Sequence, residues 1–133
     1  KGVAGSVLPL GATINMDGTA LYLGILALFA SQAFGIELTL MNYFMIALTA
    51  AVVSIGAAGI PSASLFLLAT VLSTFGATPE QIALVVGFIL PVDRVMDMAR
   101  TVVNVTGDAA VATTVAKWEG ELDEETFRDP ATI

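Results

Sequence analysis

The hydrophobic pattern divides the chain into four long apolar blocks separated by short polar or glycine-rich breaks. The first block, 3–14, is too short to cross a bilayer alone, because a spanning helix needs about 20 residues. A polar break at 15–19 separates it from a second block at 20–36. We interpret the two blocks as one membrane crossing interrupted in its middle, which predicts a broken transmembrane helix over residues 2–36.

The third block, 38–75, contains no charged residue, and its centre reads SIGAAGIPS. Two glycines and a proline within six residues break a helix, leaving two arms of about 24 Å each at 1.5 Å per residue. The arms are either ordinary transmembrane helices joined at the surface or a re-entrant hairpin whose tip stops inside the protein. We favour a re-entrant helical hairpin over 38–75, because an external loop usually carries a charged residue and this tip has only serine.

The fourth block predicts one long helix over residues 79–117. Thr78 is a suitable N-cap, and Pro79 suits the first helical position. Pro91 allows a kink about a third of the way along. The helix is expected to end near Trp118, a residue typical of the membrane interface.

A narrow polar stripe runs along this last helix. Its members are spaced four, three, four and four residues apart and fall within about 80° of arc; they are Asp93, Asp97, Arg100, Asn104 and Asp108. A charge at the centre of a spanning helix costs roughly 3 kcal/mol. The stripe therefore predicts a transport or ion-binding site that faces a protein interior or a water cavity.

Composition supports an all-α membrane protein. The 133 residues are 56 % hydrophobic and only 13 % charged, about half the charged share of an ordinary soluble domain. Between residues 2 and 79 the only charges are Asp17 and Glu37. The chain has no cysteine and no histidine, which excludes disulfides and a histidine proton switch and leaves no nucleophile–base pair that would indicate an enzyme.

The two ends of the chain differ from its middle. Residues 118–133 hold six acidic residues against Arg128 alone, so we expect a mobile acidic cytoplasmic tail that does not bind nucleic acid. Lys1 is not an initiator methionine and lies at the start of an apolar segment, so we expect a C-terminal fragment of a longer protein.

The membrane part carries more carboxylates than cations, since four aspartates face only Arg94 and Arg100. Buried carboxylates without partners take up protons or hold cations. Carboxylate, amide and carbonyl oxygens suit hard cations. The composition therefore favours Na⁺ or H⁺ as a co-transported ion.

Three features each allow two interpretations. Arg100 and Asp97 either form an internal salt bridge holding two helices together or bind the carboxylate and the ammonium of a substrate. The segment 15–19 is either a turn between helices or an unwound stretch whose carbonyls coordinate ions. The tip 59–62 is either a tight loop or a source of backbone N–H groups for a carboxylate.

Three motifs resemble the glutamate/aspartate transporter family of cation-coupled amino-acid and dicarboxylate symporters. They read NMDGT at 15–19, GAAGIP at 56–61, and DMART at 97–101 running into NVTGD at 104–108. The resemblance implies that residues 1–117 form the C-terminal part of a transport domain. It covers the broken helix, the second hairpin and the last helix.

The resemblance also implies roles for matching residues. In the substrate site, Arg100 would bind the side-chain carboxylate and Asp97 the amino group, and the remaining members would be Thr19, Gly59, Ile60, Thr101 and Asn104. One Na⁺ would lie on Asp108 with carbonyls of Gly11, Asn15 and Asn104. A second would lie under the hairpin, on carbonyls around Thr13, Ser54, Ile55 and Ala57. A third would involve Asp17 and the Asn15 side chain.

The implied protein is a homotrimeric, integral membrane symporter of the bacterial inner (plasma) membrane, in contact with lipid. It would take up glutamate or aspartate with Na⁺ by an elevator-type movement, with the hairpin as gate. Asp97 together with Arg100 favours an acidic amino acid over a C4-dicarboxylate, and H⁺ remains an alternative to Na⁺. The rivals from other classes are a channel or pore subunit and a purely structural membrane bundle.

Overall fold

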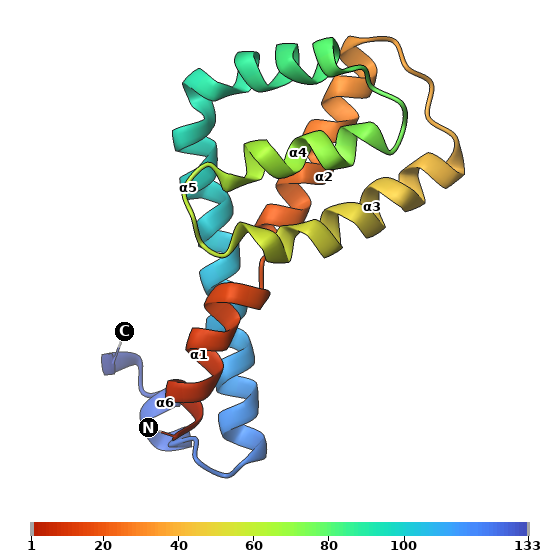
Figure 1. The fold of residues 1–133 in the computed structure, drawn as a ribbon. Helices are drawn as coiled ribbons and strands as arrows, with labels where there is room; N and C mark the ends of the chain where they lie inside the picture. The colour runs from red at the N-terminus through yellow and green to blue at the C-terminus, as the bar shows by residue number, and fades with distance from the viewer. Residues whose placement is uncertain (1, 133) are drawn as a thin grey trace.

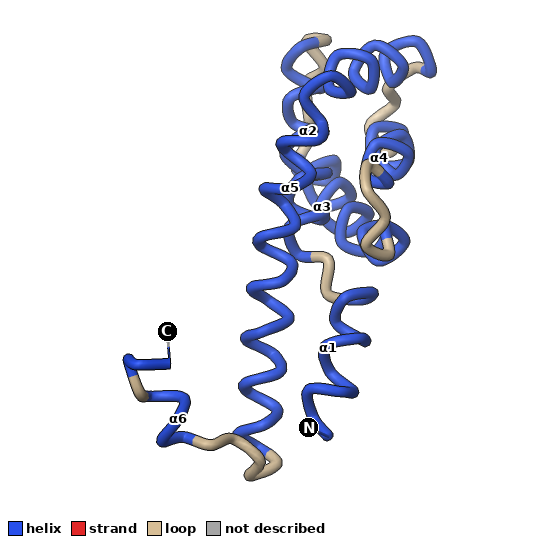
Figure 2. Tube along the Cα trace, turned by 90° about the vertical axis from the view of Figure 1, so that its left-hand side faces the viewer, coloured by secondary structure: helices blue, strands red, loops and turns tan. Residues whose placement is uncertain are grey.

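The computed structural model describes residues 2–132, and within that range it contains helices and no strand (Figure 2). The elements are α1 (Gly2–Ile14), α2 (Asp17–Ala33), α3 (Leu40–Ser54), the 3-10 helix η1 (Ile55–Ala57), α4 (Ala63–Ser73), α5 (Pro79–Trp118), α6 (Glu124–Arg128) and the 3-10 turn η2 (Pro130–Thr132). Residues 1 and 133 lie outside the described residues. They are the first residue of the predicted transport-domain part and the last residue of the predicted tail.

Among residues 2–132, two stretches are long and apolar enough to cross a membrane by length and composition, namely Gly2–Ala33 and Leu40–Ala57. The first of them contains the break between α1 and α2. Only Asn15 and Met16 lie outside helix there, so the interruption is shorter than the five-residue break that the sequence predicted. The Asn15 N–H still donates to the Gly11 carbonyl at 2.8 Å, which continues the last turn of α1.

Helices α3 and α4 pack against each other as a hairpin joined by η1 and a tight tip (Figure 1). At the tip, Ala58, Gly59 and Ser62 adopt left-handed backbone angles, with φ of 46°, 69° and 59°. Both arms contact α2, and the tip end of the hairpin contacts α1 through η1. The hairpin therefore lies over the joint between α1 and α2.

Helix α5 begins with a reciprocal cap, which confirms Thr78 as the N-cap. The Gln81 N–H donates to the Thr78 hydroxyl at 3.3 Å, and the Thr78 N–H donates to the Gln81 side chain at 2.9 Å. Figure 1 shows the axis of α5 changing direction between its start, at the top of the view, and the part that runs past α2, and Pro91 lies inside this helix. Beyond that bend, α5 runs past α2 and then beside α1 (Figures 1 and 2).

The apolar core lies where α2, α3, α4 and the first half of α5 meet. It is formed by Tyr22, Leu23, Leu26, Ala27, Ala30, Ile46, Ala50, Leu65, Leu68, Val71, Leu72, Val85 and Ile89. Outside this core many large apolar side chains are exposed, and Leu40 and Phe66 are 87 % and 83 % exposed. A surface of this kind fits burial in lipid or against further polypeptide.

The acidic tail, predicted as a mobile extension, contains the short helix α6. The Asp123 side chain caps α6 by accepting the Thr126 N–H at 3.0 Å. Glu124 pairs with Lys117 at the end of α5 at 3.3 Å and with Arg128 at 3.1 Å. The hydrogen bond and charge of Lys117, aided by the charge of Arg128, hold the pKa of Glu124 below its usual value.

We expect Gly18→Ala to destabilise the packing of α2 on α5. A Cβ at Gly18 would collide with the backbone carbonyl oxygen of Arg100 and lie 3.0 Å from the Cβ of Val103. Overpacking of this kind costs about 1–3 kcal/mol. The measurement is thermal unfolding of the whole protein in detergent. Gly24→Ala is the control, because a Cβ at Gly24 meets no described atom within 4 Å. Equal melting temperatures for the two variants would contradict this account.

Candidate functional site

All five residues of the polar stripe are buried, and they continue the face of α5 that begins in the apolar core. Along this face Val85 and Ile89 are followed by Asp93, Asp97, Arg100, Asn104 and Asp108. The face packs on α2 and then on α1. A charged face can be buried there only because it meets polar groups at the joint between these two helices.

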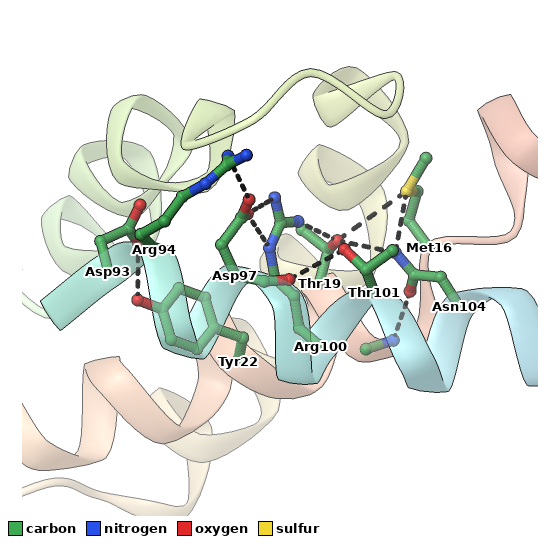
Figure 3. A network of polar contacts seen from close by, with 10 residues as sticks. Met16, Thr19, Tyr22, Asp93, Arg94, Asp97, Arg100, Thr101 and Asn104 are labelled. Atoms are coloured by element: carbon green, nitrogen blue, oxygen red, sulfur yellow. Dashed lines mark hydrogen bonds and ion pairs between the residues drawn. The ribbon is translucent and has the colours of Figure 1, made fainter.

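Arg100 links the stripe to α2. Its Nε donates to Asp97 Oδ1 at 2.7 Å, its Nη2 donates to the same oxygen, and its Nη1 donates to the Thr19 hydroxyl (Figure 3). The side chains of Arg100 and Asp97 are 6 % and 7 % exposed. The ion pair thus lies within one helix, and Thr19, rather than Asp97, connects Arg100 to its neighbour.

Asn104 caps the N-terminus of α2. Its Oδ1 accepts the Gly18 N–H at 2.8 Å, which satisfies a donor that a helix N-terminus would otherwise leave unpaired. Its Nδ2 donates to the Met16 sulfur at 3.3 Å and to the Thr19 hydroxyl at 3.4 Å. Met16 is the N-cap of α2 and makes no side-chain cap itself, so Asn104 supplies that cap from α5.

Asp108 lies against the end of α1. Its Oδ1 accepts the Asn15 amide at 3.0 Å, and the same amide lies 3.5 Å from the backbone carbonyl oxygen of Asn104. A Cβ at Gly11 would collide with the Asp108 carboxylate, so the carboxylate directly contacts the backbone of α1. Four of the predicted cation ligands, Gly11, Asn15, Asn104 and Asp108, are therefore together.

Asp17 and Asn15 meet at a second glycine. A Cβ at Gly107 would lie 2.6 Å from Asn15 Nδ2 and 2.6 Å from Asp17 Oδ2. Both side chains therefore contact the backbone of α5, although Asp17 itself is largely exposed. This brings together the two residues predicted for a third cation.

The residues predicted to bind a second cation lie where α1 contacts η1. They are Thr13, Ser54, Ile55 and Ala57. The Thr13 hydroxyl donates to the Pro9 carbonyl at 3.3 Å, and the Ser54 hydroxyl donates to the Ala51 carbonyl at 2.8 Å. Both hydroxyls donate to carbonyls of their own helices. A cation bound here would therefore be bound by the backbone carbonyl oxygens of this group. The Ala57 carbonyl already accepts the Ile60 N–H at 2.9 Å.

A cavity of about 530 Å³ separates the hairpin tip from α5. Its lining includes Asn15, Gly59, Ile60, Asp97, Arg100, Thr101, Asn104 and Asp108, and also Ala12, Met16, Pro61, Arg94, Met98, Val102 and Val105. A Cβ at Gly59 would lie 3.6 Å from the Ala12 carbonyl oxygen, so the tip approaches α1. Two predicted donors are engaged elsewhere, since the Ile60 N–H bonds to Ala57 and the Thr101 hydroxyl donates to the Asp97 carbonyl at 2.8 Å.

Two residues at the site, Tyr22 and Arg94, have no role in the site predicted from the sequence. The Tyr22 hydroxyl donates to Asp93 Oδ1 at 3.0 Å, while Asp93 Oδ2 is buried with no hydrogen-bond partner. Arg94 lies at the cavity with its Nη1 3.7 Å from Asp97 Oδ2. The available signal for Tyr22 is its spacing three residues after Thr19, which puts both on one face of α2.

The charges in this region are incompletely paired. Among the described residues no ion pair involves Asp17, Asp93 or Asp108. Within residues 2–132 there is also no group of three or more histidine, cysteine, aspartate or glutamate side chains that could hold a metal ion. A cation bound here would rest on single carboxylates together with amide and carbonyl oxygens, and oxygen donors suit hard cations.

Comparisons with known proteins agree on one family. The family model described as the sodium:dicarboxylate symporter family matches residues 1–118. The chain is 45 % identical over 120 residues to a "Proton/sodium-glutamate symport protein" of Bacillus subtilis, covering 90 % of this chain and 27 % of that protein. It is 40 % identical over 119 residues to a "Proton/glutamate-aspartate symporter" of Escherichia coli, covering 90 % and 26 %.

A third relative carries a different substrate in its name. The chain is 42 % identical over 126 residues to a "C4-dicarboxylate transport protein" of Rhodospirillum rubrum, covering 94 % of this chain and 27 % of that protein. The chain thus spans about a quarter of the length of these relatives.

We expect Tyr22→Phe to destabilise the protein by about 1–3 kcal/mol, because it removes the hydrogen bond to a buried carboxylate. Thermal unfolding of the whole protein measures the effect. Tyr43→Phe is the matched control, since Tyr43 is the other tyrosine of the chain and is 50 % exposed. A loss of stability no larger than that of the control would show that the contact between Tyr22 and Asp93 contributes nothing.

Proposed function

Because the chain belongs to the sodium:dicarboxylate symporter family, we propose that it is part of a secondary active symporter for acidic amino acids, glutamate or aspartate. In this proposal the cavity beneath the hairpin tip receives the solute, and Na⁺ is the coupled ion. The single observation that carries the proposal is that one cavity is lined by a buried arginine, a buried aspartate and the hairpin tip.

The substrate assignment rests on charge complementarity. A guanidinium binds a carboxylate through two parallel hydrogen bonds, and a carboxylate binds an ammonium. An acidic amino acid carries both groups and would bring an ammonium to Asp97 and a carboxylate to Arg100. Since Arg100 now donates to Asp97 and Thr19, binding requires Arg100 to exchange its bond with Asp97 for one with the solute.

The ion assignment rests on the carboxylates without ion-pair partners. Asp108 is 8 % exposed, contacts the Asn15 amide and lines the same cavity. A cation bound between Asp108 and the carbonyls of Gly11 and Asn104 would offset this buried charge. Its proximity to the cavity supports coupling between ion and solute.

We further propose that the hairpin is re-entrant and gates the cavity, as part of an elevator-type transport domain in a plasma membrane. The closeness of the tip to Ala12 and its place in the cavity lining support the gate. The exposed apolar surface and the two candidate spans support the membrane setting.

A C4-dicarboxylate is a second candidate substrate. The observation that favours it is that Asp97 has a second cationic partner, Arg94, at 3.7 Å, so Asp97 keeps a partner when Arg100 binds a solute that carries no ammonium. Coupling to H⁺ is the matching alternative to Na⁺, and measuring uptake with and without each ion gradient separates the two. A channel or pore subunit would instead conduct ions without saturable solute-coupled flux.

The experiment that tests the proposal is thermal stabilisation of the whole purified protein by L-aspartate, L-glutamate and succinate, each with and without Na⁺. We expect stabilisation of the wild type. For Arg100→Ala we expect the affinity for an acidic amino acid to fall by about 30-fold or more, because a buried charge partner is lost. Arg128→Ala is the control, since Arg128 is 73 % exposed and lies in the tail.

Because Arg100→Ala leaves Asp97 without its buried partner, Arg100→Lys is a second variant that keeps the charge and loses the planar fork. A cooperative melting transition shows that each variant is folded. Wild-type ligand affinity in both folded variants would refute the role of Arg100, and no stabilisation of the wild type by any of the three solutes would refute the proposed function.

We expect Asp108→Asn to raise the Na⁺ concentration needed for half-maximal uptake by about tenfold, because one charge at the ion site is removed. Uptake into vesicles containing the whole protein, measured as a function of Na⁺, gives the value. Asp123→Asn is the control, because Asp123 caps the exposed helix α6 and asparagine is an equally good N-cap. A Na⁺ response unchanged from the wild type would remove Asp108 from the ion site.

A further inference from the structure

Asp97 lies between two guanidinium groups, one on either side of its carboxylate (Figure 3). Oδ1 accepts hydrogen bonds from Nε and Nη2 of Arg100. Oδ2 lies 3.7 Å from Nη1 of Arg94. The Arg94 side chain is 68 % exposed, whereas that of Asp97 is 7 % exposed. One oxygen is therefore held inside the protein by Arg100, and the other faces an exposed cation, Arg94.

All three residues line the cavity opposite the hairpin tip. With two guanidinium groups and one carboxylate, this part of the lining has a net charge of +1. Because the Arg94 side chain is 68 % exposed and its Nη1 lies 3.7 Å from Asp97 Oδ2, solvent screens this pair and its contribution to stability is small. The place of Arg94 beside Asp97 is therefore better explained by an effect on the ligand than by an effect on folding.

We propose that Arg94 determines which anions the cavity accepts, by neutralising Asp97 when the ligand brings no ammonium group. The inference rests on the proposed transport of acidic solutes. The ammonium of aspartate or glutamate approaches Oδ2, the oxygen that faces the exposed Arg94 side chain, and it displaces that side chain. A dicarboxylate such as succinate has no cation, and Arg94 then keeps its position at Oδ2.

The consequence is a difference between ligands. Without Arg94, a bound succinate would bring a carboxylate close to the uncompensated Oδ2 of Asp97. Like charges brought together in a desolvated site strongly oppose binding. Aspartate carries its own ammonium and avoids this repulsion. Arg94 is thus a specificity-determining residue that widens the range of ligands to dicarboxylates without an amino group.

The test is calorimetric titration of the whole purified protein with L-aspartate and with succinate in sodium-containing buffer at neutral pH. For Arg94→Gln we expect the succinate Kd to rise by about tenfold or more and the aspartate Kd to change by a smaller factor. Arg94→Lys keeps the charge and is expected to lie between the wild type and Arg94→Gln. A general structural defect would weaken both ligands equally.

The rescue variant is Arg94→Gln combined with Asp97→Asn, which removes the uncompensated charge without changing the shape of the side chain. In this double variant the Kd for succinate should fall back toward the wild-type value, and aspartate should no longer bind more tightly than succinate. Equal weakening of both ligands in Arg94→Gln, or no recovery in the folded double variant, overturns the inference. A wild type that binds aspartate and not succinate also overturns it and leaves the proposed function standing, whereas a wild type that binds neither overturns both.

Discussion

The structure depends on one constraint, which is that a charged helix face can be buried only against groups that satisfy it. The polar half of α5 meets the joint between α1 and α2 in antiparallel order. Asn15 contacts Asp108, Gly18 contacts Asn104, Thr19 contacts Arg100, and Tyr22 contacts Asp93. A continuous apolar helix opposite α5 would have left Asp93, Asn104 and Asp108 without these partners, and a buried carboxylate without a partner costs several kcal/mol.

Local spacing was sufficient to predict much of this arrangement. The stripe on α5, the break near Asn15 and the cap at Thr78 follow from periodicity and from the preferences of individual residues, and the structure contains each of them. The register of α2 against α5 could not be predicted, because it depends on contacts between residues some 70 to 90 positions apart, such as Tyr22 with Asp93. Helix α6 was missed because a short helix depends on its cap and on the pairing of Glu124 with Lys117.

The relation between Asp97 and Arg100 illustrates a different limit. A spacing of three residues on a helix permits an ion pair, and the same two charges also suit a ligand with opposite charges. The structure contains the ion pair and also a cavity beside it. The two interpretations that the sequence left open are therefore compatible, since an internal partner can hold a charge until a ligand replaces it.

Asn104 contributes two groups that point to different parts of the site. Its side chain caps α2 beside Thr19, while its backbone carbonyl lies near the Asn15 amide that also binds Asp108. A ligand or ion that displaces Asn104 at one of these two groups changes the free energy of binding at the other group. Thermodynamic reciprocity then requires that each of two such ligands changes the affinity for the other by the same factor.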